Sequence, residues 1–252
     1  MIVSSAQCAL HYATFEELEI QSAATAIDWL STAELDLWRQ FRSTVRKSTF
    51  LAGRVLAKRL LRQQHCAAAT CKPAQITIRS GGSSSTGVRP RATLSGHRLA
   101  YSLSISHTCD AVLVGGTNQF GMSVGVDLVR MRKLGAAFER SWLTETEAEF
   151  LRQYQDDMTV ADIWAMKEAV YKACHRGESF APRSVEIRLE PEGTTVYYHG
   201  RNLKNRCTVR IWRLGDEVAA VATYERVPAR NGHASELRNG ALRSLGLKPH
   251  SA

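Results

Sequence analysis

Residues 120–129 read FGMSVGVDLV, and this stretch alternates between two sets of side chains. Met122, Val124, Val126 and Leu128 form one set, and Ser123, Gly125, Asp127 and Val129 form the other. Because successive side chains of a strand point to opposite faces, the pattern predicts a half-buried β-strand. Asp127 then lies on the polar face near the end of that strand. A carboxylate at such a place either caps a turn or serves as a ligand for Mg²⁺.

The segments on either side of this strand predict an order of elements that occurs twice. Helices are predicted at 33–40, 43–64, 144–155 and 160–175, and strands at 75–79, 99–106, 111–115, 185–189, 194–199, 208–213 and 218–224. The order of helix followed by strands predicts an α+β fold made of two similar subdomains. We expect the subdomains to cover residues 1–118 and 119–227. Residues 80–90 are rich in Gly and Ser and predict a flexible loop, and residues 228–252 predict a mobile polar tail.

Charge and composition narrow the class of protein. The 252 residues include 33 Lys and Arg and 24 Asp and Glu, a net charge of +9. This excess indicates an anionic partner, such as nucleic acid, a phosphorylated small molecule or an acidic protein, or else a solvated basic surface. The chain has no apolar run near the roughly 20 residues of a membrane span and no secretory signal, so we expect a cytoplasmic protein. The six cysteines lack the spacing of a zinc site and are expected to be reduced.

The predicted helix at 160–175 contains the sequence WAMKEAVYKA, residues 164–173. Its helical spacing predicts one stripe that holds Trp164, Lys167, Glu168, Tyr171 and Lys172. One interpretation is that Glu168 and Lys172 form no more than an exposed ion pair on the helix surface. The aromatic residues among the charges also fit the wall of a cleft, with a carboxylate for metal binding or proton transfer and lysines for anions.

Ser106 and His107 lie at the predicted turn between the strands at 99–106 and 111–115. A single histidine is often structural. Here hydroxyl groups flank it, and a basic loop is close in sequence, so phosphate binding is the alternative.

Five motifs in this order resemble those of the 4′-phosphopantetheinyl transferases of the long, surfactin-synthetase type. They are FLAGRVLAKRLL at 50–61, GVRP at 87–90, SISH at 104–107, GVD at 125–127 and W-x-x-K-E-x-x-x-K from Trp164 to Lys172. The resemblance covers about residues 35–225. It implies a pseudo-dimer within one chain, and we expect a monomer.

The resemblance implies an Mg²⁺-dependent holo-[acyl-carrier-protein] synthase. Such an enzyme moves the 4′-phosphopantetheine arm of coenzyme A to a serine of an apo acyl or peptidyl carrier domain in fatty-acid, polyketide or nonribosomal peptide biosynthesis, and releases 3′,5′-ADP. Asp127 and Glu168 are implied as metal ligands, with Glu168 and Lys172 as catalytic residues. The implied coenzyme-binding residues are His107, Ser106, Arg89, Arg46, Arg54 and Lys167. Carrier domains are generally acidic, so the basic surface has a use in steering them.

Val129 departs from the family pattern, because many members of the long type have an acidic residue there as a third metal ligand. Two carboxylates, pyrophosphate oxygens and water can still complete the coordination of Mg²⁺. One alternative is a catalytically weakened relative that only binds carrier proteins. Another is a nucleic-acid-binding protein, although no known nucleic-acid-binding motif supports it. Neither nucleic acid nor a membrane is the partner that we expect.

Overall fold

The computed structural model describes residues 2–4, 8–20, 23–80, 89–131, 136–154, 158–190 and 193–226. The first half contains β1 (Ile2–Ser4), β2 (Ala9–Thr14), α1 (Ala23–Trp29), α2 (Thr32–Gln40), α3 (Thr44–Gln64), α4 (Cys66–Ala69), η1 (Pro73–Gln75), β3 (Ile76–Arg79), β4 (Arg91–Leu94), β5 (His97–Arg98), β6 (Ser102–His107) and β7 (Ala111–Thr117). The second half contains β8 (Met122–Arg130), α5 (Ala136–Trp142), α6 (Glu145–Gln153), α7 (Val160–Cys174), η2 (Pro182–Ser184), β9 (Val185–Glu190), β10 (Gly193–Tyr198), β11 (Arg201–Asn202), β12 (Cys207–Leu214) and β13 (Glu217–Glu225).

The two halves share one topology. The main sheet of the first half has the strand order β1-β2-β7-β6, and that of the second half has the order β12-β13-β8, with every pairing antiparallel. Each half adds a small three-stranded sheet, β3-β4-β5 or β11-β10-β9. In chain order, β2, β6 and β7 of the first half correspond to β8, β12 and β13 of the second. The sheet order β2-β7-β6 therefore matches β8-β13-β12. The predicted α+β pseudo-dimer is therefore confirmed.

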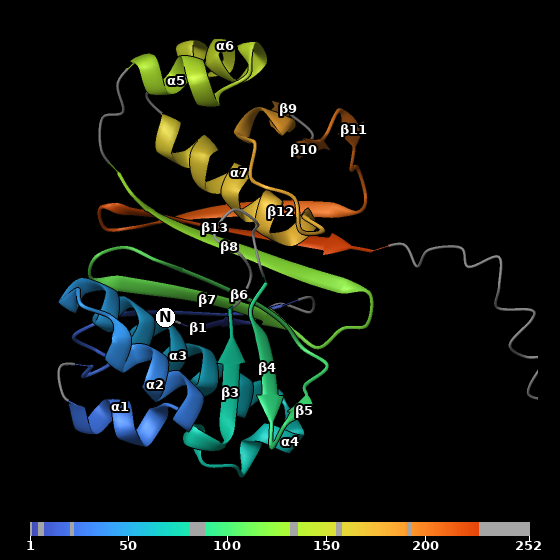
Figure 1. Cartoon of the computed structure of the whole chain (residues 1–252). Helices are drawn as coiled ribbons and strands as arrows, with labels where there is room; N and C mark the ends of the chain where they lie inside the picture. The colour runs from blue at the N-terminus through green and yellow to red at the C-terminus, as the bar shows by residue number, and fades with distance from the viewer. Residues whose placement is uncertain are drawn as a thin grey trace, which may run out of the picture.

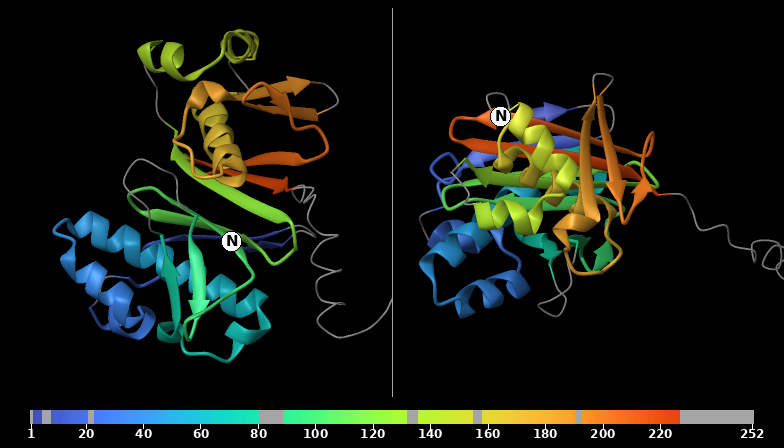
Figure 2. Two further views of the ribbon diagram at one scale, coloured as in Figure 1. Left: turned by 45° about the vertical axis from the view of Figure 1, so that its right-hand side comes forward. Right: turned by 90° about the horizontal axis from the view of Figure 1, so that it is seen from above.

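The main sheets face each other at the centre of the molecule, with α3 covering one and α7 the other (Figures 1 and 2). An apolar cluster that includes Leu10, Leu113, Val124 and Val126 lies between the sheets. Separate clusters fill the space between each sheet and its helix. The face of β8 with Val124 and Val126 thus packs on the other half, and the opposite face lies under α7. The alternation predicted which side chains share a face, but both faces are buried, so the prediction of a half-buried strand is wrong.

A buried ion pair ties α2 to α3 in the first half. Glu34 lies at the third position of α2, where one of its oxygens accepts the main-chain N–H of Ser31 at the helix start. The same carboxylate pairs with Lys58 of α3 at 2.5 Å and accepts the N–H of Ile78 in β3 at 2.8 Å. Buried charges are stable only when paired and hydrogen-bonded in this way.

The second half repeats this arrangement with different residues. Glu147 lies at the third position of α6 and accepts the N–H of Thr144, as its capping-box spacing predicted. It also pairs with Lys167 of α7 at 2.5 Å and accepts the N–H of Ile187 in β9 at 2.9 Å. Two halves with so little visible sequence similarity therefore share a buried polar connection as well as a topology.

Gly125 allows α7 to lie unusually close to β8. A Cβ atom at this position would come within 2.0 Å of the carbonyl oxygen of Ala169 and 2.5 Å of the main-chain nitrogen of Ala173. Both contacts are with backbone, which cannot give way easily. A glycine is therefore required here, and the close packing brings the α7 side chains near Asp127, two residues further along β8.

Serine side chains join the two halves along the free edge of β8. The main-chain N–H of Val124 donates to Oγ of Ser102 at 3.1 Å, and that of Val126 donates to Oγ of Ser104 at 3.0 Å. β8 is an edge strand of its own sheet, so these N–H groups would otherwise lack a partner. The polar side of β6 is thus buried and connects the halves.

Most predicted elements agree with the structure, but β6 begins at Ser102 rather than at residue 99. The prediction missed β1, β2, α1, α4, α5, β4, β5 and β11. The subdomain boundary at 118–119 remains a prediction. Residues 228–252 and most of the loop at 80–90 lie outside the described residues. Within the described part of the chain, no helix is long and apolar enough to cross a membrane.

Candidate active site

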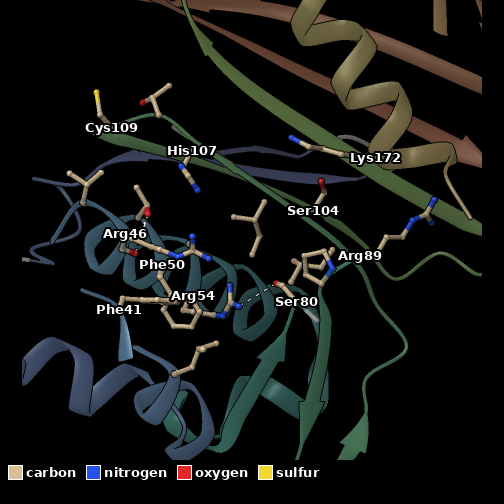
Figure 3. A pocket seen from close by; sticks show the side chains of 18 of the residues that line it. Phe41, Arg46, Phe50, Arg54, Ser80, Arg89, Ser104, His107, Cys109 and Lys172 are labelled. Atoms are coloured by element: carbon tan, nitrogen blue, oxygen red, sulfur yellow. Dashed lines mark hydrogen bonds between the residues drawn. The ribbon is translucent and has the colours of Figure 1, made fainter. Parts of the chain in front are cut away.

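A cavity of about 1130 Å³ lies where α3, β6 and the end of α7 meet (Figure 3). Its lining includes five of the predicted site residues, namely Arg46, Arg54, Arg89, His107 and Lys172. These cationic or titratable side chains come from both halves. The large cavity is therefore suited to a polyanionic ligand.

A smaller cavity of about 450 Å³ adjoins the first. The residues that line it are Ser106, His107, Thr108, Cys109, Asp127, Leu128, Val129, Arg130, Trp164 and Glu168. His107, Thr108 and Cys109 line both cavities. The predicted acids therefore lie in the small cavity, and most of the predicted cations lie in the large one.

Asp127, Glu168 and Lys172 form one cluster. The ammonium of Lys172 lies 2.6 Å from Oδ1 of Asp127 and 3.6 Å from Oε2 of Glu168. Asp127 comes from β8 and the other two come from α7, which the glycine at 125 brings close. The three residues therefore lie close together, as predicted.

Two carboxylates, those of Asp127 and Glu168, share the single ammonium of Lys172, and this shifts the pKa values in the cluster. Burial raises the pKa of Glu168 above its usual value, and the charge of Asp127 adds to this effect, although Lys172 opposes it. Burial acts to lower the pKa of Lys172, but Asp127 and Glu168 outweigh it and raise that pKa. Lys172 is therefore an ammonium ion, and Glu168 binds a proton more readily than an exposed glutamate does.

Ser106 is nearly buried and donates a hydrogen bond of 2.8 Å from its hydroxyl to Oδ1 of Asp127. The resemblance implies that it binds the coenzyme. In the structure Ser106 contacts the predicted metal ligand and also accepts a hydrogen bond of 3.4 Å from Lys172, so its position fits the orientation of these two side chains.

His107 ends β6 and is open to both cavities. The surrounding protein removes enough water to lower its pKa, and the charge of Lys172 lowers it further. The imidazole is therefore largely neutral near pH 7. A phosphate dianion beside it would favour the protonated form.

Arg46 and Arg54 lie on one wall of the large cavity, each against a phenylalanine. The guanidinium of Arg46 lies 4.9 Å from the ring centre of Phe41, and that of Arg54 lies 4.3 Å from the ring centre of Phe50. Arg54 also donates to Oγ of Ser80 at 3.2 Å. Arg54 is almost fully buried, and its guanidinium lies 3.3 Å from Glu34. Because Glu34 already pairs with a lysine, this wall has one buried positive charge in excess.

Arg89 faces the large cavity from the first half, and its contacts are with main-chain carbonyl groups of the second half. Its Nη2 donates to the carbonyl oxygen of Ala173 at 2.5 Å and to that of His175 at 2.8 Å. These groups lie at the end of α7. The predicted coenzyme-binding residue thus has a second set of partners that the sequence did not indicate.

The position of Lys167 in the structure does not fit the expectation that it binds the coenzyme. Lys167 has no exposed surface, lines neither cavity and pairs with Glu147. Helical spacing puts Lys167 next to Glu168, but it points toward α6. The residues of the predicted stripe on α7 therefore have two roles. Lys167 is structural, whereas Glu168 and Lys172 lie at the site.

Several lining residues were not predicted as site residues. Cys109, Phe41 and Phe50 line the large cavity, and His175 lies there with its Nδ1 buried and without a hydrogen-bond partner. The aromatic pair Phe41 and Phe50 beside basic residues was a signal available in the sequence. His175 gave none, because only the end of α7 brings it to the cavity.

The residues present fit a hard divalent cation. Asp127 and Glu168 both line the small cavity and supply carboxylate oxygens, the ligands that Mg²⁺ prefers. In the described ranges, no group of three or more His, Cys, Asp or Glu side chains is arranged to hold a metal. Mg²⁺ usually binds through one or two carboxylates together with phosphates and water. The donor set is thus consistent with a metal that is held jointly with a ligand.

The family comparison finds a similarity in the second half of the chain. Residues 123–222 match the model of the 4′-phosphopantetheinyl transferase superfamily, and Asp127, Glu168 and Lys172 lie within the match. This part of the chain is therefore similar to that superfamily, and the match supports the predicted class of enzyme, a 4′-phosphopantetheinyl transferase. The long, surfactin-synthetase type remains a prediction.

Two solved structures are distantly similar. A holo-(acyl-carrier-protein) synthase from Bacillus anthracis in complex with CoA (3′,5′-ADP) is 20% identical, with a TM-score of 0.35; the match covers 46% of this chain and 95% of that chain. An ACPS–CoA complex from Chronobacterium ammoniagenes is 19% identical, with a TM-score of 0.34; the match covers 42% of this chain and 98% of that chain. No curated protein sequence matches the chain. These likenesses are too distant to support an argument about the site.

Proposed function

We propose that this protein transfers the 4′-phosphopantetheine arm of coenzyme A to a serine hydroxyl of an apo carrier domain, with Mg²⁺ as cofactor. The observation that carries the proposal is the cluster of Asp127, Glu168 and Lys172, within the superfamily match and next to a cavity lined with cations. The reaction forms a bond between the serine oxygen and the phosphorus that bears the arm. It breaks the bond from that phosphorus to the bridging oxygen, and 3′,5′-ADP leaves.

The large cavity would hold the coenzyme. Arg54 supplies an excess buried charge, Arg46 adds a second cation, and His107 gains a proton when a phosphate lies beside it. Charge-assisted hydrogen bonds of this kind are shorter and stronger than neutral ones. The rings of Phe41 and Phe50, which meet edge to face with centres 5.2 Å apart, offer apolar surface to the adenine.

Asp127 and Glu168 would hold Mg²⁺, which supplies charge neutralisation at the pyrophosphate. Ser106 orients Asp127 through its hydrogen bond. Lys172 would stabilise negative charge on the pyrophosphate and on the leaving oxygen, because its raised pKa keeps it charged. Such fixed charges lower the barrier when they point to where charge develops.

Glu168, directly or through a water molecule, would accept the proton of the carrier serine. Its raised pKa brings it closer to the operating pH than that of an exposed glutamate, as suits a general base. Because Glu168 lines the small cavity and Lys172 the large one, we propose that the serine enters through the small cavity.

The decisive experiment incubates the protein with coenzyme A and Mg²⁺ and a panel of apo acyl and peptidyl carrier domains. Intact-mass spectrometry then detects addition of one phosphopantetheine arm, and chromatography detects 3′,5′-ADP. Lack of transfer to every carrier, with coenzyme A still bound, would favour the catalytically weakened relative. The same panel identifies the carrier class. A monomeric state and a cytoplasmic location are part of the proposal, and size-exclusion chromatography with light scattering tests the first.

A further inference from the structure

Arg89 connects the two halves of the molecule at the cavity (Figure 3). It belongs to the first half, directly before Pro90 and β4, and its guanidinium donates to the carbonyl oxygens of Ala173 and His175 in the second half, at 2.5 and 2.8 Å. A residue before proline is restricted to extended conformations, so the backbone fixes the direction from which Arg89 approaches.

The two acceptors lie where a helix most needs partners. The last carbonyl groups of an α-helix have no donor within the helix, and together they carry a partial negative charge. α7 ends at Cys174, so Ala173 and His175 flank its last residue. A guanidinium can satisfy these carbonyl groups, because it has several N–H donors in one plane. Its positive charge also offsets their partial negative charge.

The last turn of α7 is held from a second side by its own half. The hydroxyl of Ser123 in β8 donates to the same carbonyl oxygen of Ala173 at 2.8 Å. Ser123 fixes this turn to β8, and Arg89 fixes it to the cavity wall of the first half. Lys172 precedes Ala173 directly, so this is also the turn that bears the ammonium of the site.

We propose that Arg89 is a positioning residue: it holds the last turn of α7, and with it the ammonium of Lys172, in register with the cavity of the other half. For its effect on turnover the inference rests on the proposed transfer reaction. The structural contact itself concerns the free protein. The inference gives Arg89 a role other than the phosphate binding that its motif implies.

The first test is hydrogen exchange of the free protein. Arg89→Ala should speed amide exchange at residues 172–176 by about tenfold or more, because the end of α7 opens locally more often once its main-chain carbonyl groups lose the guanidinium. Arg91→Ala is the matched control: it removes a nearby charge from an exposed position in β4. Unchanged exchange at the end of α7 in Arg89→Ala would overturn the proposal.

The second test separates positioning from phosphate binding. Positioning predicts that Arg89→Ala lowers kcat about 10- to 100-fold, the scale of a misplaced catalytic group, while KM for coenzyme A changes less than about threefold. The same loss is expected with dephospho-coenzyme A. Arg89→Lys keeps the charge but not the planar pair of donors, and it should restore kcat in part.

A rise in KM that occurs with coenzyme A but not with dephospho-coenzyme A, with kcat retained, would instead assign Arg89 to the 3′-phosphate and overturn the proposal. If the wild-type protein transferred no arm to any carrier, the proposed function would fail. The exchange measurement would still decide whether Arg89 holds α7, so the two failures are distinguishable.

Discussion

Lys172 donates a hydrogen bond of 2.6 Å to Asp127, and this bond joins α7 to β8 across the site. Lys172 thus already pairs with Asp127, the carboxylate that would bind the metal in the proposed reaction. Binding of Mg²⁺ with the pyrophosphate would therefore release the ammonium toward the phosphate oxygens. In the free protein, the single ammonium of Lys172 offsets the charge of only one of the two carboxylates.

We expect Glu168→Gln and Lys172→Ala each to reduce arm transfer about 100-fold or more, the scale of a lost general base or electrostatic group. Glutamine retains the shape of Glu168 but cannot take the serine proton. Intact-mass rates at saturating coenzyme A measure the effect. Glu149→Gln, at an exposed position of α6, is the control. Near-full turnover in either folded site variant would remove that residue from the mechanism.

His107→Ala should weaken binding of coenzyme A roughly ten- to hundredfold, the value of a charge-assisted hydrogen bond. It should change binding of dephospho-coenzyme A little. Isothermal titration with both ligands measures the difference. Equal losses with both ligands would mean that His107 does not contact the 3′-phosphate.

The same histidine predicts a direction for the pH dependence. Burial lowers its pKa in the free protein, and a bound phosphate dianion should raise it. Between these two pKa values the complex holds a proton that the free protein lacks, so affinity should fall as pH rises through that window. Titrations in buffers of different ionisation enthalpy should detect proton uptake in the wild type and none in His107→Ala. Uptake that persists in the variant would contradict the assignment.

Lys167→Met should lower the free energy of unfolding by about 3–5 kcal/mol, because it leaves Glu147 buried without its cation. The folded fraction should bind coenzyme A normally, since Lys167 lines neither cavity. Urea denaturation and calorimetric titration measure the two quantities. Lys58→Met, the corresponding change in the first half, should cost less, because Arg54 still lies 3.3 Å from Glu34 and keeps it paired. Lost affinity with unchanged stability would restore Lys167 to the binding site.

Val129→Glu tests the register of β8. Val129 lines the small cavity with Asp127 and Glu168, so a glutamate there has a path to the metal. The half-saturating Mg²⁺ concentration should fall, while turnover need not rise, because tighter ground-state binding does not lower the chemical barrier. Activity is titrated against Mg²⁺, with thermal stability measured alongside. A stable variant with an unchanged Mg²⁺ requirement would show that residue 129 does not reach the metal.

The sequence predicted best what depends on local periodicity. The alternation around Asp127 assigned the faces of β8 correctly, because a strand has a period of two whatever it packs against. The cluster with Glu168 and Lys172 was predicted through the resemblance, whose spacing reflects the approach of α7 to β8. The structure adds why Gly125 is needed for that approach.

Contacts between distant segments could not be predicted in this way. The capping box at Thr144 was recognised, but not the second role of Glu147, since its partner Lys167 lies on another helix. The polar side of β6 was recognised as a face, yet its use by Ser102 and Ser104 depends on the position of β8. Such pairings follow from tertiary packing, which no pattern within one element encodes.

The repeated topology creates two equivalent locations, and their side chains differ in charge. Asp127 is fourth from the end of β8 and pairs with the fourth residue of β13; His11 has the same place in β2 and pairs with the fourth residue of β7. Glu168 directly follows Lys167, the buried lysine of α7. In the same way, Arg59 follows Lys58, the buried lysine of α3. Two acids in one half thus correspond to an imidazole and a guanidinium in the other. The metal of the proposed function therefore has a place at only one of these two locations, because the guanidinium of Arg59 would repel a cation where Glu168 would bind one.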